Sequence, residues 1–226
     1  MSVANRIRLR TFALSVCVAG TPAGAALLWD NTLEHNVETS GIAFGGKRWQ
    51  TMIVAENFRL EHPSVIQEIG FESLNREDWT YDSVTVYLLM DRAGNGSAEP
   101  LLHSVLGEFE VFGFDTGRRD RGLPVWRYSV PLRAAIDPGN WFLGMHANGE
   151  GTDVFWATSD GGQGGNTPAW YSLDGGGTWA RMQQGTRFDL TLELHGETVP
   201  EPSSLLVLCG AVALLAARRV TGGMRR

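Results

Sequence analysis

Short stretches in which apolar and polar residues alternate constrain the fold of this chain most. Residues 83–90 (SVTVYLLM) and 108–114 (EFEVFGF) follow a two-residue period, and Gly, Asn and Asp separate such stretches along the chain. A period of two places successive side chains on opposite faces of a β-strand. We find no convincing amphipathic helix, so we expect an all-β fold of about ten strands, an antiparallel and jelly-roll-like β-sandwich.

The two margins of this pattern are less regular. Residues 187–196 (RFDLTLELHG) predict a closing strand whose inward side chains are Phe188, Leu190, Leu192 and Leu194. Residues 27–46 could hold edge strands or an extended arm, and only residues 132–136 suggest a helical turn. The oligomeric state is open at this point.

The first 25 residues have the features of a secretory signal peptide. Arg6, Arg8 and Arg10 precede a short apolar stretch (FALSVCVAG), and small residues (AGA, 23–25) follow it. The apolar stretch is too short to remain as a membrane-spanning helix. We therefore expect the chain to cross the inner membrane and the folded domain to occupy residues 26–199.

The last 27 residues, 200–226, combine three features in a fixed order. Pro200, Glu201 and Pro202 come first, an uninterrupted apolar run at residues 205–217 follows, and Arg218 and Arg219 end it. As a helix that run spans about 20 Å, against a hydrocarbon core of roughly 30 Å. It predicts one short transmembrane helix with its basic end in the cytoplasm.

This order resembles the PEP-CTERM sorting signal of Gram-negative bacteria. The resemblance implies that a membrane protease of the exosortase type cuts the tail near Pro-Glu-Pro. It also implies release to the cell surface or to the extracellular matrix, in association with exopolysaccharide and biofilm. Residues 51–196 are in addition similar to β-sandwich proteins of unassigned function that carry this signal, through AENF at 55–58, DPGNWFLGMHA and DGGGTW. That likeness supplies no catalytic residues.

Charge and cysteine content limit the function classes. Residues 26–199 keep 12 of the 19 Lys and Arg and 24 of the 25 Asp and Glu, a net charge of −12. Such a surface repels phosphate backbones, so nucleic acid is not an expected partner. Cys17 and Cys209 lie in the targeting segments, so no disulfide framework is expected in the domain.

An acidic surface attracts cations, and we tested the sequence for a calcium loop. Asp91, Asn95 and Gly96 fit an EF-hand pattern, but Ala93 and Leu102 occupy two ligand positions. The five histidines have no metal-ligand spacing. We therefore expect neither a metal site nor a cofactor, although calcium binding stays open.

The octet SLDGGGTW, residues 172–179, resembles the Asp box of sialidase-like β-propellers. In that motif polar side chains and glycines build a tight turn and do not touch substrate. A propeller needs several copies on a longer chain, and this chain has one full copy. We therefore expect a structural turn made by Ser172, Asp174, Gly176 and Trp179.

The sequence offers few residues for ligand contact or catalysis. Trp79, Trp170 and Trp179 border turns. We expect packing roles for them first, and any that are exposed could stack on sugar rings. We find no nucleophile motif and expect no catalytic residues. A glycoside hydrolase would need two opposed carboxylates, for which Glu108, Glu110 and Asp115 are weak candidates.

The function expected from the sequence is that of an exported, exosortase-sorted protein with a structural or adhesive role at the cell surface or in the exopolysaccharide matrix. The alternative is a carbohydrate-binding module, and a glycan-degrading enzyme is a third reading. The expected partners are the sorting protease, the membrane through the C-terminal helix before processing, and an exopolysaccharide.

Overall fold

The computed structural model describes residues 25–31, 41–76, 78–91, 93, 99–159, 169–182 and 189–200. These residues form β-strands and turns, without a helix, which confirms the all-β prediction. The first seven strands are β1 Ala26–Asp30, β2 Gly41–Gly46, β3 Ile53–Leu60, β4 Ser64–Asn75, β5 Thr80–Asp91, β6 Pro100–Phe109 and β7 Phe112–Asp120. The others are β8 Leu123–Ile136, β9 Gly139–Glu150, β10 Asp153–Ser159, β11 Trp170–Ser172, β12 Ala180–Arg181, β13 Asp189–Leu190 and β14 Glu193–Thr198.

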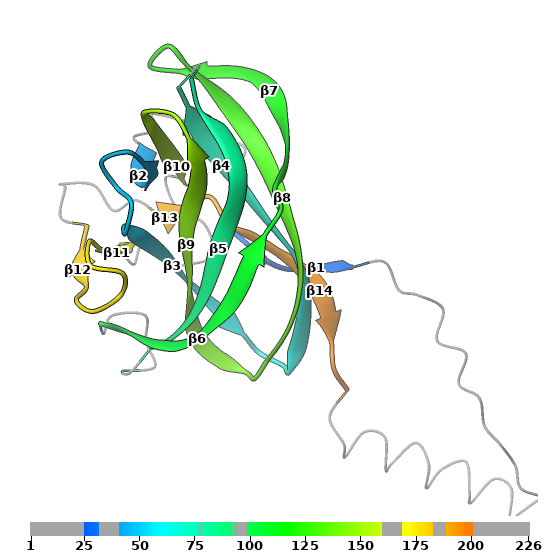
Figure 1. The fold of residues 1–226 in the computed structure, drawn as a ribbon. Coiled ribbons are helices and arrows are strands. Elements are labelled where there is room, and N and C mark those ends of the chain that lie inside the picture. Colours follow the sequence, from blue (N-terminus) through cyan, green and yellow to red (C-terminus); the bar gives the residue numbers. More distant parts are fainter. Residues whose placement is uncertain are drawn as a thin grey trace, which may run out of the picture.

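All these strands belong to one connected sheet with two branches (Figure 1). One branch runs β6-β5-β9-β3-β11-β12, and the other runs β7-β8-β4. On the side of β4 away from β8, β14 pairs with its first part and continues to β1, and β10 pairs with its last residues. The order β10-β2-β9 joins the two branches. The pairings are antiparallel except for one parallel contact, between Gly45 of β2 and Ala147 of β9. The sheet is therefore mixed, where the sequence predicted antiparallel pairing alone.

The main hydrophobic core lies between the two branches. It contains inward side chains of β3, β5 and β9 together with those of β4, β8, β10 and β14. Trp156 is fully buried at its centre, between Phe44 and Phe71, and its indole N–H donates to the Thr191 carbonyl at 2.7 Å. This hydrogen bond satisfies the polar atom that burial of a tryptophan would otherwise leave unpaired.

A second, smaller core lies on the opposite face of the β5-β9-β3 branch. Ala55, Leu89 and Phe142 point away from the main core, because each is one residue out of phase with an inward neighbour. Trp170 of β11 covers them. The segment from β11 to β12 therefore covers the part of this outer face that holds the second core.

The margins of the strand pattern agree with the sequence reading in part. Residues 27–46 contain two strands, the first of the two expected alternatives: β1 lies at the edge of the sheet and pairs with β14, whereas β2 pairs with β10 and β9. Residues 132–136 continue β8 rather than forming a helical turn. The closing segment is divided into β13 and β14, since Thr191 turns its N–H to Ala157, but Leu190, Leu192 and Leu194 are fully buried as predicted. Phe188 lies outside the described residues.

Candidate binding site

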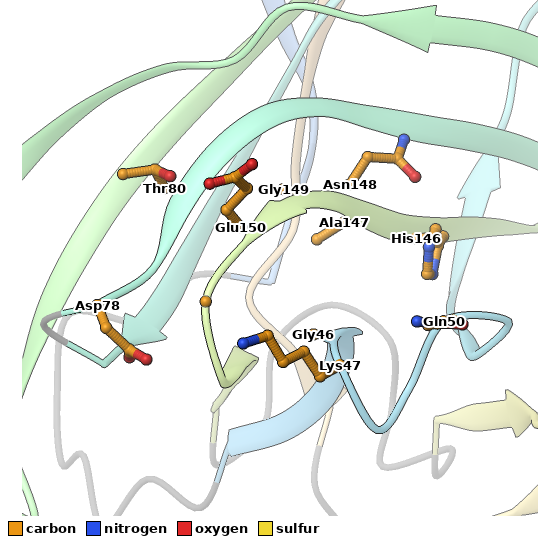
Figure 2. A pocket seen from close by; sticks show the side chains of 11 residues that line it. Gly46, Lys47, Gln50, Asp78, Thr80, His146, Ala147, Asn148, Gly149 and Glu150 are labelled. Carbon is orange, nitrogen blue, oxygen red and sulfur yellow. The ribbon is translucent and has the colours of Figure 1, made fainter.

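A polar groove of about 720 Å³ lies at the end of β9. Three segments that are distant in the sequence meet there (Figure 2). Lys47 and Gln50 follow β2, Asp78 lies in the turn before β5 and Thr80 begins that strand. Strand β9 contributes His146, Asn148 and Glu150. Antiparallel pairing of β5 with β9 and the contact of β2 with β9 bring these segments together.

The contribution of β9 follows from strand periodicity. His146, Asn148 and Glu150 are two residues apart, so their side chains share one face, while Met145 and Ala147 point into the main core. The sequence reading missed these three polar residues. Polar residues at every second position of an otherwise apolar strand could have indicated that this face of β9 is open to a ligand.

Some polar groups of the groove are already used by the fold. Nδ1 of His146 is 2.8 Å from the Met52 carbonyl oxygen. The Asn148 amide donates to Ser83 and Thr85, at 3.0 and 2.9 Å. Asp78 accepts from the Thr152 N–H and hydroxyl, which fixes the turn between β9 and β10.

Other polar groups are available to a ligand. Within the described part of the chain, the side chains of Lys47, Gln50 and Glu150 have no hydrogen-bond or ion-pair partner, and all three are exposed. Figure 2 shows Lys47 extending toward the Asp78 side of the groove and Gln50 beside His146. The groove thus presents a cation, an amide and a carboxylate, which can donate and accept hydrogen bonds.

The three tryptophans proposed for sugar stacking have different positions from those expected. Trp79 and Trp170 are only 6% and 7% exposed, so their ring faces are not open to a sugar, and both side chains pack in the interior. Trp79 belongs to the main core and packs edge-on against Tyr81, with ring centroids 5.6 Å apart. Trp170 covers the second core, and the Arg181 guanidinium lies 4.9 Å from the centroid of its ring. Trp179 is half-buried against the same cluster.

The octet at 172–179 has the hydrogen bonds of a side-chain-stabilised turn. The Ser172 hydroxyl donates to Asp174 at 2.7 Å and accepts from the Gly176 N–H at 2.7 Å. Asp174 also accepts from the N–H and hydroxyl of Thr178, at 2.9 and 2.8 Å. These donors, the Thr178 N–H first, lower the pKa of Asp174 to about 2. A positive φ of 98° at Gly176 meets the expected need for glycine, and Trp179 lies beneath it.

One buried carboxylate is unrelated to any motif in the sequence. Glu56 of β3 is fully buried and accepts from the Leu190 N–H at 2.7 Å and from the Asn31 amide at 3.4 Å. Burial, and then the neighbouring Asp189 carboxylate, raise the pKa of Glu56 well above its ordinary value. Sequence reading missed this group because an isolated acid in a strand carries no signal of burial.

The sorting-signal residues fall at the limit of the described chain. Pro200 is exposed directly after β14 and Val199, whose N–H donates to the Pro63 carbonyl at 2.7 Å. Glu201, Pro202, Arg218 and Arg219 lie outside the described residues. In the ranges that are described, no helix has the length and apolar character needed to cross a membrane.

The described ranges contain no group of three or more His, Asp or Glu side chains placed to hold a metal ion. The acids considered for glycan hydrolysis are exposed: Glu108 lies on β6, Asp115 on β7, and Glu110 between these two strands. No family model, curated protein or solved structure matches this chain.

Proposed function

We propose that this chain is an exported protein which an exosortase-type protease sorts to the cell surface or to the exopolysaccharide matrix, where it serves a structural or adhesive role. The proposal rests on one observation, the order of Pro200-Glu201-Pro202, an apolar run and Arg218-Arg219 directly after the last strand. In this proposal residues 1–25 are the signal peptide and residues 26–199 are a jelly-roll-like β-sandwich.

The arrangement of the two chain ends supports this proposal. β1 pairs with β14, and Ala26 lies opposite Gly196, so residue 25 and Pro200 leave the domain from neighbouring strands. A protease at the membrane must reach the segment after β14. Exposure of Val199 and Pro200 leaves the start of that segment accessible.

The two-branched sheet supports the sandwich. One core cluster joins inward residues of β3, β5 and β9 to those of β4, β8 and β14, as two face-to-face sheets would. The branches end in different strands, β6 and β7.

The test is the carboxyl terminus of the native protein. We expect mass spectrometry of surface material to end near Pro-Glu-Pro, without residues 205–217. A Glu201→Ala variant should keep its tail and fractionate with membranes, whereas Glu197→Ala, at an exposed position of β14, should be processed normally. Recovery of the intact terminus from wild-type surface material would overturn the proposal.

A carbohydrate-binding role is the second candidate, and the groove at the end of β9 favours it. Its uncommitted Lys47, Gln50 and Glu150 suit hydroxyl-rich ligands better than the buried Trp79 and Trp170 do. A glycan-array screen of the full chain, with and without calcium, should then give hits that Lys47→Ala and Gln50→Ala remove. Hits that persist in both variants would exclude the groove.

A further inference from the structure

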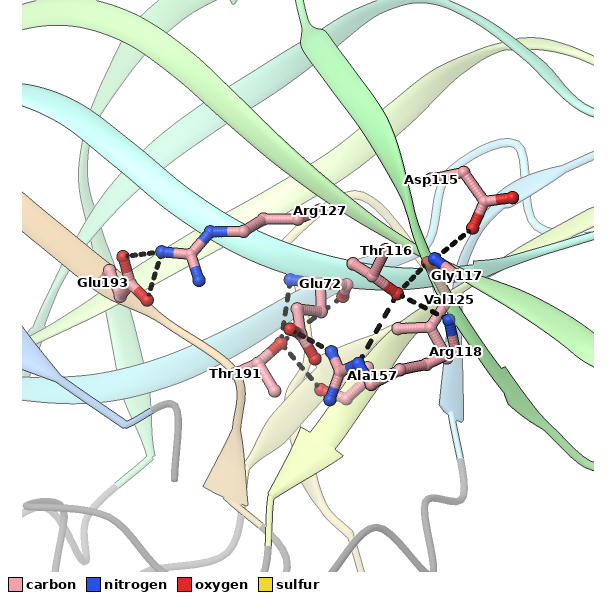
Figure 3. A network of polar contacts seen from close by, with 10 residues as sticks. All are labelled: Glu72, Asp115, Thr116, Gly117, Arg118, Val125, Arg127, Ala157, Thr191 and Glu193. Carbon is pink, nitrogen blue, oxygen red and sulfur yellow. Dashed lines mark hydrogen bonds and ion pairs between the residues drawn. The ribbon is translucent and has the colours of Figure 1, made fainter. Parts of the chain in front are cut away.

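The groove at the end of β9 holds carboxylates that form no ion pair with any described residue. Glu150 is exposed and has no polar partner in these ranges, and Asp78 accepts hydrogen bonds from uncharged donors alone. Glu72 of β4 is in contrast paired with the Arg118 guanidinium of β7 (Figure 3). The negative charge of the groove is therefore available to a ligand.

The side chains of β9 present three hydrogen-bond acceptors along the groove, and Figure 2 shows them following one another on the strand. The Met52 carbonyl oxygen can only accept, so Nδ1 of His146, 2.8 Å away, carries the proton, and Nε2 of the neutral ring is an acceptor. The Glu108 carboxylate fixes the Asn148 amide in the same way, because Nδ2 donates to it at 3.2 Å and Oδ1 has no partner among the described residues. The Glu150 carboxylate is the third acceptor. Since each is two residues from the next, the row extends about 14 Å.

The charge of the groove is negative overall. Its lining includes one cation, Lys47, and two carboxylates, Asp78 and Glu150, and the Glu108 carboxylate lies against the Asn148 amide of the lining. Two exposed arginines are close to the lining in sequence without belonging to it: Arg48 and Arg76. The domain around the groove has a net charge of −12, which attracts a cationic ligand from a distance.

We propose that the groove binds an amino-sugar polymer whose protonated amino groups donate to the acceptors of β9. This proposal rests on the carbohydrate-binding role proposed above and names the class of glycan. An ammonium group donates three hydrogen bonds and accepts none, which matches a row of acceptors that includes an unpaired carboxylate. The hydroxyl oxygens of the sugar can accept from Lys47 and Gln50, the uncommitted donors. A row of about 14 Å suits several linked sugars better than one.

Two other classes of ligand fit the groove less well. A polyuronate carries carboxylates, which the net negative charge repels. A lysine-rich peptide carries its ammonium groups on chains of methylenes, which pack on apolar surface. Apart from glycines, Ala147 is the one apolar residue in the lining of this groove. A sugar has polar groups on nearly every ring carbon and needs no such surface.

Isothermal titration calorimetry of the full-length chain in detergent, at about pH 6 to keep amino groups protonated, tests this specificity. We expect a glucosamine hexamer to bind about tenfold or more tightly than an N-acetylglucosamine hexamer, because acetylation removes the charge and two of the three donors of each amino group. Added salt should reduce the difference. Glu150→Gln keeps the shape and an acceptor, so it should weaken binding of the glucosamine hexamer about fivefold to tenfold and leave the acetylated hexamer unaffected.

Matched variants separate the amine contact from other effects. Glu197→Gln makes the same change at an exposed position of β14 and should bind both hexamers as the wild type does. Gln50→Ala should weaken both hexamers alike, because its amide serves the hydroxyl groups.

Three results would overturn the proposal, each in a different way. Equal affinity for the two hexamers, lost in Gln50→Ala, would remove the amine contact and leave the carbohydrate-binding role intact. Binding of neither hexamer would remove both. A lysine hexapeptide that binds more tightly than the glucosamine hexamer, and less tightly to Glu150→Gln, would assign the groove to basic peptides. Sorting is read separately, from the carboxyl terminus of the native protein.

Discussion

Replacing Glu56 by glutamine should change how the stability of this protein depends on pH. Glu56 is fully buried on β3, and burial together with Asp189 raises its pKa well above its ordinary value of 4.5. An amide has nearly the same shape and keeps an acceptor for the Leu190 N–H, which lies 2.7 Å from the Glu56 carboxylate. The substitution therefore removes the ionisable group and keeps most of the packing.

The sign follows from proton binding. Above pH 4.5 the unfolded chain has released the Glu56 proton, whereas the folded chain retains it up to its raised pKa. The stabilisation by this proton is fully present below the unfolded pKa and is lost as the pH rises toward the folded one. Over that window one proton costs about 1.4 kcal/mol of unfolding free energy per pH unit.

Urea unfolding followed by tryptophan fluorescence measures this slope. We expect the wild-type free energy of unfolding to fall as the pH rises above the ordinary pKa of 4.5 toward the raised pKa of the folded state, and the Glu56→Gln variant to be flatter by up to about 1.4 kcal/mol per pH unit. Glu150→Gln is the matched control, because that carboxylate is exposed in the groove. Parallel profiles for wild type and Glu56→Gln would refute the reasoning.

Three further substitutions test other parts of the structure. The wild type should lose stability as the pH falls from 3.8 toward about 2, because the lowered pKa of Asp174 stabilises the folded state only while the carboxylate is ionised. Asp174→Asn should remove this loss, which acid titration followed by circular dichroism measures. Gly149→Ala should cost about 1–3 kcal/mol in urea unfolding, since its Cβ would lie 2.1 Å from the Thr80 carbonyl oxygen, and an unchanged midpoint would contradict that contact. Trp156→Ala should cost about 3–5 kcal/mol through the cavity and the lost bond to Thr191, and a smaller loss in thermal unfolding would mean that the core refills.

Local sequence determined the elements whose conformation depends on close neighbours. The alternating residues 83–90 lie within β5. In the octet 172–179, Gly, Asp and Ser form the turn through hydrogen bonds between residues no more than four positions apart. The sequence also predicted that Leu190, Leu192 and Leu194 point inward, because a two-residue period determines which side chains share a face. Even so, the period did not show the break between β13 and β14.

Only the tertiary structure decided which segments meet. Trp79 and Trp170 border turns in the sequence but are buried, because β9 and the second core lie against them. The groove combines Lys47, Asp78 and Glu150, whose separation along the chain hides their proximity. Strand pairing is long-range, and alternation specifies the two faces of a strand without naming its neighbours. The alternating pattern also could not show that β7 has a free edge, because an edge is defined by the pairing of all the other described strands.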